Sequence, residues 1–248
     1  MVLGVPVTSY IANETSFSVA MIFFAAINLL VLIVTIIFVP SLSVKERLSY
    51  GAQLSVLKHT VTWHSILAVI LINGAMFGFF SYMSDYLRNI TALPFKIISI
   101  FLLIYGGANI AGNIIAGKLL ATKPTATIKA IPFIMLCAYG LLYLLGEFSI
   151  PMACIILMLG ILAGIASNNC QWMISNAASE APDFANGLFL ASTNLGTMLG
   201  TSFCGMFISQ WGTHYSVLGA IFFLISGIAF TFLHGMAKRP DKIVVQQS

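Results

Sequence analysis

Residues Asn186–Gln210 form the uncharged stretch NGLFLASTNLGTMLGTSFCGMFISQ, which is long enough to cross a bilayer as one helix. Gly196 and Gly200 form a GxxxG pair on one face of that helix. In lipid no hydrophobic force drives helices together, so small residues that allow close backbone approach form the attractive surface. The stretch predicts a helix-packing surface, with a bordering substrate path as the alternative. A second GxxxG pair, Gly160 and Gly164, predicts another helix contact.

The composition indicates a membrane protein. Hydrophobic residues make up 59% of the 248 residues and charged residues 7%, against roughly 25% charged in soluble domains. With a mean hydropathy of +1.00, this excludes a soluble protein. The net charge of +4 does not indicate nucleic-acid binding, because the basic residues lie between the apolar segments and not on one face. The cysteines lie in apolar stretches without CxxC spacing, so we expect buried thiols and neither a disulfide nor a metal site.

Six further apolar segments are predicted to span the membrane. They are Ser16–Val39, Val61–Met83, Lys96–Gly117, Ala130–Leu145, Ile150–Trp172 and His214–Met236. Met1–Ala12 is apolar but too short to span alone, and it is typical of the end of a longer helix. Ser41–Thr60 is the longest polar segment and is typical of a linker. The sequence therefore predicts an all-α membrane protein with seven complete transmembrane helices and an N-terminal partial helix.

The basic residues between the spans predict the orientation of the chain. With Ser41–Thr60 in the cytoplasm, nine Lys and Arg residues fall on the cytoplasmic side, and only Arg88 and Lys96 fall outside. This distribution agrees with the positive-inside rule, and the opposite orientation reverses it. We therefore predict a multi-pass protein of the cell membrane with a cytoplasmic C-terminus.

Several segments resemble transporters of the major facilitator superfamily, in the branch of bacterial drug and sugar efflux permeases. Val2–Ile11 (VLGVPVTSYI) is similar to the Gly-Val-Pro stretch of the family's fifth helix, and Phe77–Leu87 (FGFFSYMSDYL) to the outer end of its seventh. Tyr105–Leu120 is similar to the eighth helix and the start of its loop, although the loop's usual Asp and Arg are replaced here. Glu180–Thr201 resembles the start of the eleventh helix and is the most specific match.

The resemblance implies a twelve-helix fold in two halves, with the substrate cavity between the halves. Residues 1–40 then correspond to the end of the N-terminal bundle, as part of helix five and as helix six. Residues 41–60 correspond to the cytoplasmic linker, 61–237 to the C-terminal six-helix bundle and 238–248 to a cytoplasmic tail. We accordingly expect an N-terminally truncated transporter. Its expected partners are the lipid bilayer, a small-molecule substrate and the missing N-terminal half, without nucleic acid.

No Asp, Glu, Lys or Arg lies inside a predicted span away from its ends. Such intramembrane groups usually mark proton relays, so any proton coupling would reside in the missing half. The four histidines lie near span ends, which predicts interfacial side chains and not a relay. An enzyme would need a nucleophile with its base, or a metal cluster at depth, and we find neither. We therefore predict no catalytic residue, no metal and no cofactor.

The remaining polar groups within the spans are uncharged amides. At about 1.5 Å per residue, Asn73 and Asn194 lie toward the middle of their spans, and Asn113 lies one turn from Asn109 on the same face. These four residues are the candidates for lining a substrate cavity. Interhelical hydrogen bonding is the alternative, and it is the favoured one. Asn168 lies nearer the inner end of its span, which favours a cytoplasmic vestibule or an interfacial anchor over a binding site.

Two functional hypotheses follow. The main hypothesis is the C-terminal half of an alternating-access secondary transporter that exports a small solute, in which rocking of the halves exposes the midplane asparagines to each side in turn. The alternative is a remnant or an accessory membrane bundle that transports nothing. Amide side chains suit sugars, drugs and amino-acid derivatives alike, so the substrate class stays open at this point.

Overall fold

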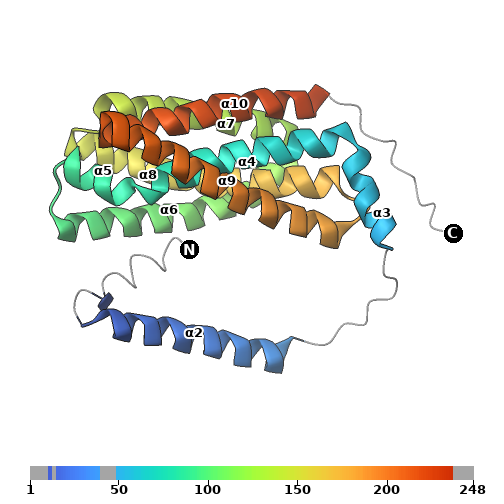
Figure 1. Ribbon diagram of the computed structural model, residues 1–248, viewed down its shortest axis with the longest axis horizontal. Helices are drawn as coiled ribbons and strands as arrows, with labels where there is room; N and C mark the ends of the chain where they lie inside the picture. The colour runs from blue at the N-terminus through green and yellow to red at the C-terminus, as the bar shows by residue number, and fades with distance from the viewer. Residues whose placement is uncertain (1–10, 13–14, 40–48, 237–248) are drawn as a thin grey trace.

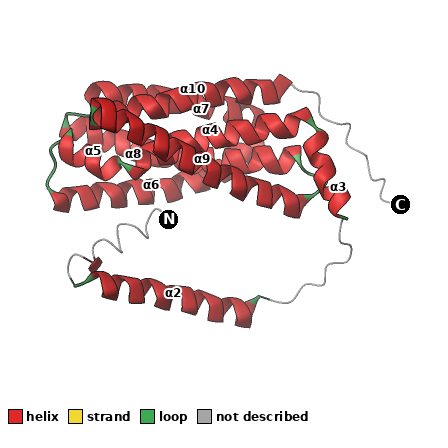
Figure 2. Cartoon of the chain, in the orientation of Figure 1, coloured by secondary structure: helices red, strands yellow, loops and turns green. Residues whose placement is uncertain are grey.

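The computed structural model describes residues 11–12, 15–39 and 49–236, and all the regular structure in these ranges is helical (Figure 2). Six helices form one bundle (Figure 1): α4 (Thr60–Ser81), α6 (Phe95–Thr122), α7 (Pro124–Leu145), α8 (Ser149–Ala177), α9 (Pro182–Trp211) and α10 (Ser216–Met236). Short helices flank or join them: α3 (Tyr50–Ser55), η1 (Val56–Lys58), α5 (Met83–Asn89) and η2 (Thr213–Tyr215). The predicted all-α membrane bundle is confirmed.

The bundle has two ends, which we name by their connections. The linker end holds α3, the junction between α6 and α7, and the end of α10, whereas the far end holds α5 and η2 (Figure 1). The α6–α7 junction is a single residue, Lys123, followed by Pro124. Proline disfavours helical backbone in the residue before it and is itself suited to the first turn of a helix, so one helix stops and the next begins there. Both helices extend beyond the predicted spans for this reason.

Helix α2 (Phe17–Phe38) lies apart from the bundle (Figure 1). The Ser16 side chain caps its first turn by accepting a hydrogen bond from the Val19 backbone N–H. Its large apolar side chains are exposed along the whole length, for example Phe17 at 73% and Phe38 at 76%. A helix that is apolar on every side requires lipid or further protein around it.

The seven long helices differ in how apolar they are. In the described part of the chain, six helices are long and apolar enough to cross a membrane: α2, α4, α6, α7, α8 and α10. Helix α9 falls outside this set although it has 30 residues, because Asn, Thr, Ser and Gly dilute its apolar character. Its position against α4 and α10 makes it part of the bundle, and its crossing of the membrane stays a prediction.

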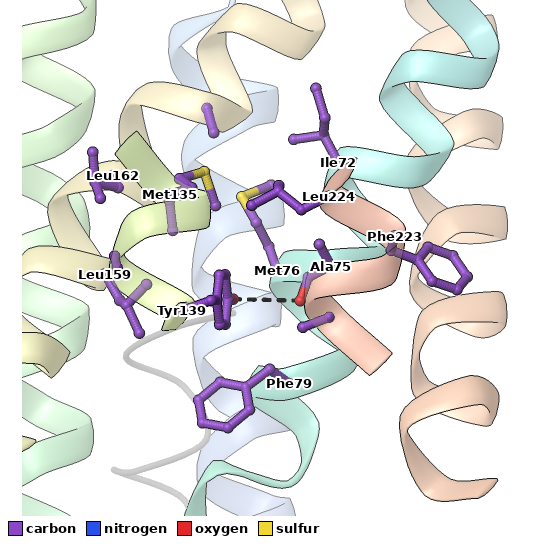
Figure 3. Close-up of a cluster of buried hydrophobic side chains, with 14 of the residues drawn as sticks. Ile72, Ala75, Met76, Phe79, Met135, Tyr139, Leu159, Leu162, Phe223 and Leu224 are labelled. Atoms are coloured by element: carbon purple, nitrogen blue, oxygen red, sulfur yellow. Dashed lines mark hydrogen bonds between the residues drawn. The ribbon is translucent and has the colours of Figure 1, made fainter. Parts of the chain in front are cut away.

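Helix α4 lies at the centre of the bundle and packs against α8, α9 and α10. The main core gathers around its middle (Figure 3), where Met76 and Phe79 meet side chains from α7, α8 and α10. The Tyr139 hydroxyl of α7 donates a hydrogen bond of 3.4 Å to the Ala75 carbonyl of α4. The exposed apolar side chains lie on the outer surfaces of the helices, which suits a lipid environment.

The crossing of α4 and α9 is a contact between backbones. A methyl group on Gly200 would overlap the carbonyl oxygen of Gly74, and one on Gly196 would overlap that of Ile70. On the opposing helix, a methyl group on Gly78 would lie 2.8 Å from the Gly200 carbonyl. The two helices therefore approach at a distance that only glycine permits on both sides.

A second crossing of this kind joins α6 and α8. A methyl group on Gly160 would lie 2.6 Å from the Tyr105 carbonyl oxygen, and one on Gly164 would overlap the Asn109 carbonyl. From the α6 side, a methyl group on Gly112 would overlap the Ile161 carbonyl. The structure thus places both GxxxG pairs of the sequence at helix crossings.

The cysteines correct one expectation. Cys170 and Cys204 are buried, but Cys137 and Cys154 are exposed on the outer surface of the bundle, and all four are free thiols. A thiol is a small, weakly polar group that an apolar surface accommodates as readily as a core does. Apolar sequence context therefore did not distinguish an outer surface from the interior.

His234 lies in the last turn of α10 and is buried by protein, which its sequence position did not indicate. Its side chain is 7% exposed, and its Nδ1 lies 2.8 Å from the Ser65 hydroxyl of α4. This hydrogen bond joins the last turn of α10 to α4 at the linker end of the bundle.

We predict that Gly200→Ala destabilises the bundle by about 1–3 kcal/mol, because the methyl group must push α4 and α9 apart. Gly187→Ala is the matched control on the same helix, since nothing lies within 4 Å of the added methyl group. We expect it to be neutral or stabilising by up to about 1 kcal/mol. Thermal unfolding in detergent, followed by size-exclusion chromatography of a fluorescent fusion, measures both. Equal melting temperatures for the two variants would rule out the close crossing.

Candidate functional site

A cavity of about 270 Å³ opens between α4, α6 and α8. Its apolar lining is Met76, Phe77, Phe80 and Ala163, and its polar lining is Tyr105, Asn109, Asn113 and Ser167. Ligand pockets are typically apolar with a few placed polar groups, which describes this lining. The volume lies just below the roughly 300–1,000 Å³ of complete pockets, so the cavity is suited to being one wall of a larger site.

Aromatic rings from α4 and α6 form the apolar side. The rings of Phe80 and Tyr105 stack with their centroids 5.0 Å apart and an interplanar angle of 27°. Phe77 meets Phe80 edge-on at 6.2 Å. Stacked rings hold one another in place, so the cavity has a firm apolar face at this side.

A chain of amides forms the polar side. Asn113 Nδ2 donates to the Asn109 carbonyl at 2.9 Å and to Asn109 Oδ1 at 3.2 Å. Asn168 of α8 in turn donates from Nδ2 to Asn113 Oδ1 and to the Gly164 carbonyl. Within the described residues, the Asn109 Nδ2 group and the Ser167 hydroxyl form no hydrogen bond. Both groups therefore remain available to a ligand.

Local structure explains why these groups meet. Tyr105, Asn109 and Asn113 follow one another at intervals of four residues, so they share one face of α6. Gly160 and Gly164 bring α8 against that helix, which places Asn168 within reach of Asn113. Two features therefore build the polar side of the cavity. One face of α6 carries Asn109 and Asn113, and the glycine crossing with α8 brings Asn168 to them.

Asn168 joins the amide chain, a contact that the sequence did not indicate, and its position in a vestibule or as an interfacial anchor stays a prediction. Helix α8 continues to Ala177, so Asn168 lies more than two turns from the helix end.

Tyr105, Phe80 and Ser167 were not among the residues predicted to line the cavity. The four-residue spacing of Tyr105 with Asn109 and Asn113 could have identified it, whereas Ser167 and Phe80 carry no such signal.

Asn73 lies apart from this cavity. Its side chain is 2% exposed, and its Nδ2 donates to the Thr193 carbonyl at 2.7 Å and to Thr197 Oγ1 at 3.0 Å, both on α9. These bonds reinforce the glycine crossing between α4 and α9. The geometry of Asn73 is that of an interhelical bond.

Asn194 also lies outside the cavity. It is exposed, and its Nδ2 donates to the Leu190 carbonyl of its own helix at 2.8 Å. The structure therefore brings together Asn109 and Asn113 but separates both from Asn73 and Asn194.

The site favours an uncharged ligand. No charged side chain lines the cavity, and its polar groups without a hydrogen bond to the described residues are the Asn109 amide donor and the Ser167 and Tyr105 hydroxyls. Across the described residues, no group of three or more His, Cys, Asp or Glu side chains is placed to hold a metal ion. The arrangement suits stacking and hydrogen bonding of a small polar solute.

Comparison with known proteins gives one family match and several relatives. The sequence profile of the Major Facilitator Superfamily matches residues 1–182. The inner membrane transport protein YdhP of Escherichia coli K12 is 24% identical over 247 residues, which cover 99% of this chain and 63% of YdhP. The putative transporter AraJ of the same strain is 23% identical, over 96% of this chain and 61% of AraJ. A probable sugar efflux transporter of Helicobacter acinonychis is 23% identical, over 94% of this chain and 60% of its own length. The chain thus spans about three fifths of the length of these relatives.

We predict that Asn73→Ala lowers the stability of the bundle by about 1 kcal/mol, because two bonds to α9 are lost where interhelical bonds average roughly 0.6 kcal/mol each. Asn194→Ala is the matched control, and we expect a change within about 0.5 kcal/mol because only a bond within its own helix is lost. The same thermal-unfolding measurement compares them. A larger loss for Asn194→Ala would contradict the structural role of Asn73.

Proposed function

The chain belongs to the Major Facilitator Superfamily, as its motifs predicted, and we propose that it transports a small solute as the C-terminal part of an alternating-access carrier. It is an integral membrane protein, and its family and relatives belong to the class of transporters rather than to a class of enzymes. The observation that carries the proposal is the cavity wall of stacked rings and amides on α4, α6 and α8. In such carriers the substrate site lies between two helical halves that rock about it.

The domain organisation follows from the same proposal. Residues 61–237 form the C-terminal bundle, 41–60 link it to the preceding half, 1–40 belong to the end of that half, and 238–248 form a tail. Two features support a partner half. The large apolar side chains of α2 are exposed, and the cavity volume of about 270 Å³ is smaller than that of a complete ligand site. The N-terminal half of a transporter would cover both.

For the substrate we propose an uncharged, hydroxyl-rich molecule, exported from the cell. A stacked aromatic pair suits the apolar face of such a molecule, and the free Asn109 amide and Ser167 hydroxyl suit its hydroxyl groups. The name of the Helicobacter relative, a probable sugar efflux transporter, agrees with this class. We further propose that no metal or cofactor takes part.

For the orientation we propose that the linker end is cytoplasmic. Lys58, Lys118, Lys123 and Lys129 lie toward the linker end, whereas Arg88 and Lys96 lie at the far end. Lys and Arg concentrate on the cytoplasmic side of membrane proteins. The C-terminus is then cytoplasmic.

We predict that the chain supports efflux when it is co-expressed with the N-terminal half of YdhP. In cells loaded with a panel of radiolabelled sugars, the pair should lower retention of at least one sugar relative to either part alone. Retention unchanged by the pair would favour the remnant or accessory bundle. Co-purification of the two parts separates failed assembly from failed transport.

In the transporting pair, Asn109→Ala should reduce the efflux rate about tenfold, because a hydrogen bond to substrate is worth roughly 1–1.5 kcal/mol. The matched control is Ser99→Ala on the same helix, since Ser99 bonds only to the Phe95 carbonyl of its own turn and lies outside the cavity. We expect unchanged efflux for the control. Equal rates for both variants would remove Asn109 from the site.

The orientation is tested by labelling from outside the cell. In a chain whose four cysteines are replaced by alanine, a single Phe148→Cys at the far end should react with a membrane-impermeant maleimide. Lys123→Cys at the linker end should react only after permeabilisation, because both positions are exposed but lie on opposite sides. The reverse pattern would invert the proposed orientation.

A further inference from the structure

A second cavity, of about 360 Å³, lies at the linker end between α7, α8 and α10. Its polar lining comes from Thr125 and Lys129 of α7, Trp172 of α8, and Thr231 and His234 of α10. This lining differs in kind from that of the first cavity, because it contains a cationic side chain. The transport site described above uses none of these residues.

Lys129 is the charged group of this cavity. Its Nζ lies 5.5 Å from the centroid of the Phe232 ring, which is a cation–π contact. With the carboxylates of the described chain Lys129 forms no ion pair. Gly235 lines the cavity beside the lysine, and a methyl group there would lie 3.2 Å from Lys129 Cε and 3.6 Å from its Nζ. A half-buried cation without an acidic partner attracts an anion.

An apolar surface continues from the cavity toward the middle of the bundle. Phe133 lies one turn beyond Lys129 on α7, and its ring meets that of Phe232 on α10 edge-on at 5.7 Å. Both rings are exposed, at 43% and 39%. Polar groups at the end of the bundle followed by exposed aromatic rings along its side match a molecule with an anionic head and an apolar tail.

We propose that this cavity binds the phosphate headgroup of an anionic phospholipid, with an acyl chain lying over Phe133 and Phe232. Lys129 supplies the charge, Thr125 lines the headgroup position, and Trp172 lies at the linker end, where an indole ring suits the membrane interface. Basic pockets between transmembrane helices on the cytoplasmic side are suited to anionic headgroups. The apolar continuation favours a lipid over a free phosphate ion.

The test uses the fluorescence of Trp172 in the full chain reconstituted into lipid nanodiscs. Trp63→Phe and Trp211→Phe leave Trp172 as the sole tryptophan, and both replaced residues are exposed, at 50% and 55%. Phosphatidylglycerol or phosphatidylcholine with brominated acyl chains is added at equal mole fraction as the quencher. We expect phosphatidylglycerol to associate about fivefold more strongly than phosphatidylcholine, the equivalent of about 1 kcal/mol for one basic residue.

Lys129→Gln should abolish this preference, and Lys129→Arg should retain it. The matched control is Lys118→Gln, which removes the same charge from an exposed position of α6 at the same end of the bundle. Gly235→Val provides a variant with the charge intact, whose side chain fills the cavity beside Lys129, and it should also lose the preference. Circular dichroism verifies that each variant keeps its helical content.

Three outcomes would overturn the proposal. The first is equal quenching of Trp172 by the two lipids in the parent chain. The second is an equal loss of preference in Lys118→Gln and Lys129→Gln, which would indicate a general effect of surface charge. The third is displacement of brominated phosphatidylglycerol by inorganic phosphate at constant ionic strength, dependent on Lys129, which would assign the cavity to a free phosphate ion.

Discussion

Direct contact between helix backbones, at the crossings of α4 with α9 and of α6 with α8, is the constraint around which the bundle is arranged. Apolar side chains gain no hydrophobic free energy by moving from lipid into a helix contact, because lipid tails are equally apolar. Helices in a membrane therefore associate through close packing and hydrogen bonds between helices. Gly74, Gly196 and Gly200 allow this at one crossing, and Gly112, Gly160 and Gly164 allow it at the other. The remaining helices of the bundle, α7 and α10, pack on this pair of crossings, and α10 also approaches α9 and α4 closely at Gly219 and Gly227.

The crossings also decide what each asparagine does. Asn73 faces α9 across the first crossing, and its amide group donates two hydrogen bonds to that helix. Asn113 lies at the edge of the second crossing, where Asn168 reaches it but the cavity stays open beside Asn109. The same side chain thus fastens two helices in one place and leaves a donor for a ligand in another. An asparagine bonds to the neighbouring helix where that helix offers an acceptor, as α9 does to Asn73, and keeps a free donor where a cavity lies beside it, as at Asn109.

Charge separates the two cavities along the bundle. The cavity of α4, α6 and α8 contains only uncharged polar groups, which suits a neutral solute passing through the membrane interior. The cavity of α7 and α10 contains Lys129 at the linker end, where a cation remains near the polar membrane surface. The proposed solute site and the proposed lipid site therefore lie in different cavities of the same six-helix bundle, and they share no lining residue.

The amino-acid sequence by itself determined the membrane class, the positions of the long helices, the family and the two glycine pairs, because these depend on composition, span length and spacing along one helix. It also placed Asn109 and Asn113 on a common face, since periodicity fixes which residues of a helix lie together. Only the tertiary structure decided that Asn73 bonds to α9 and that Asn168 bonds to Asn113. It also decided that His234 is buried beside Ser65 and that Cys137 is exposed. The physical reason is that helical periodicity defines a face but not its neighbour, and in an apolar chain the neighbour is either lipid or protein.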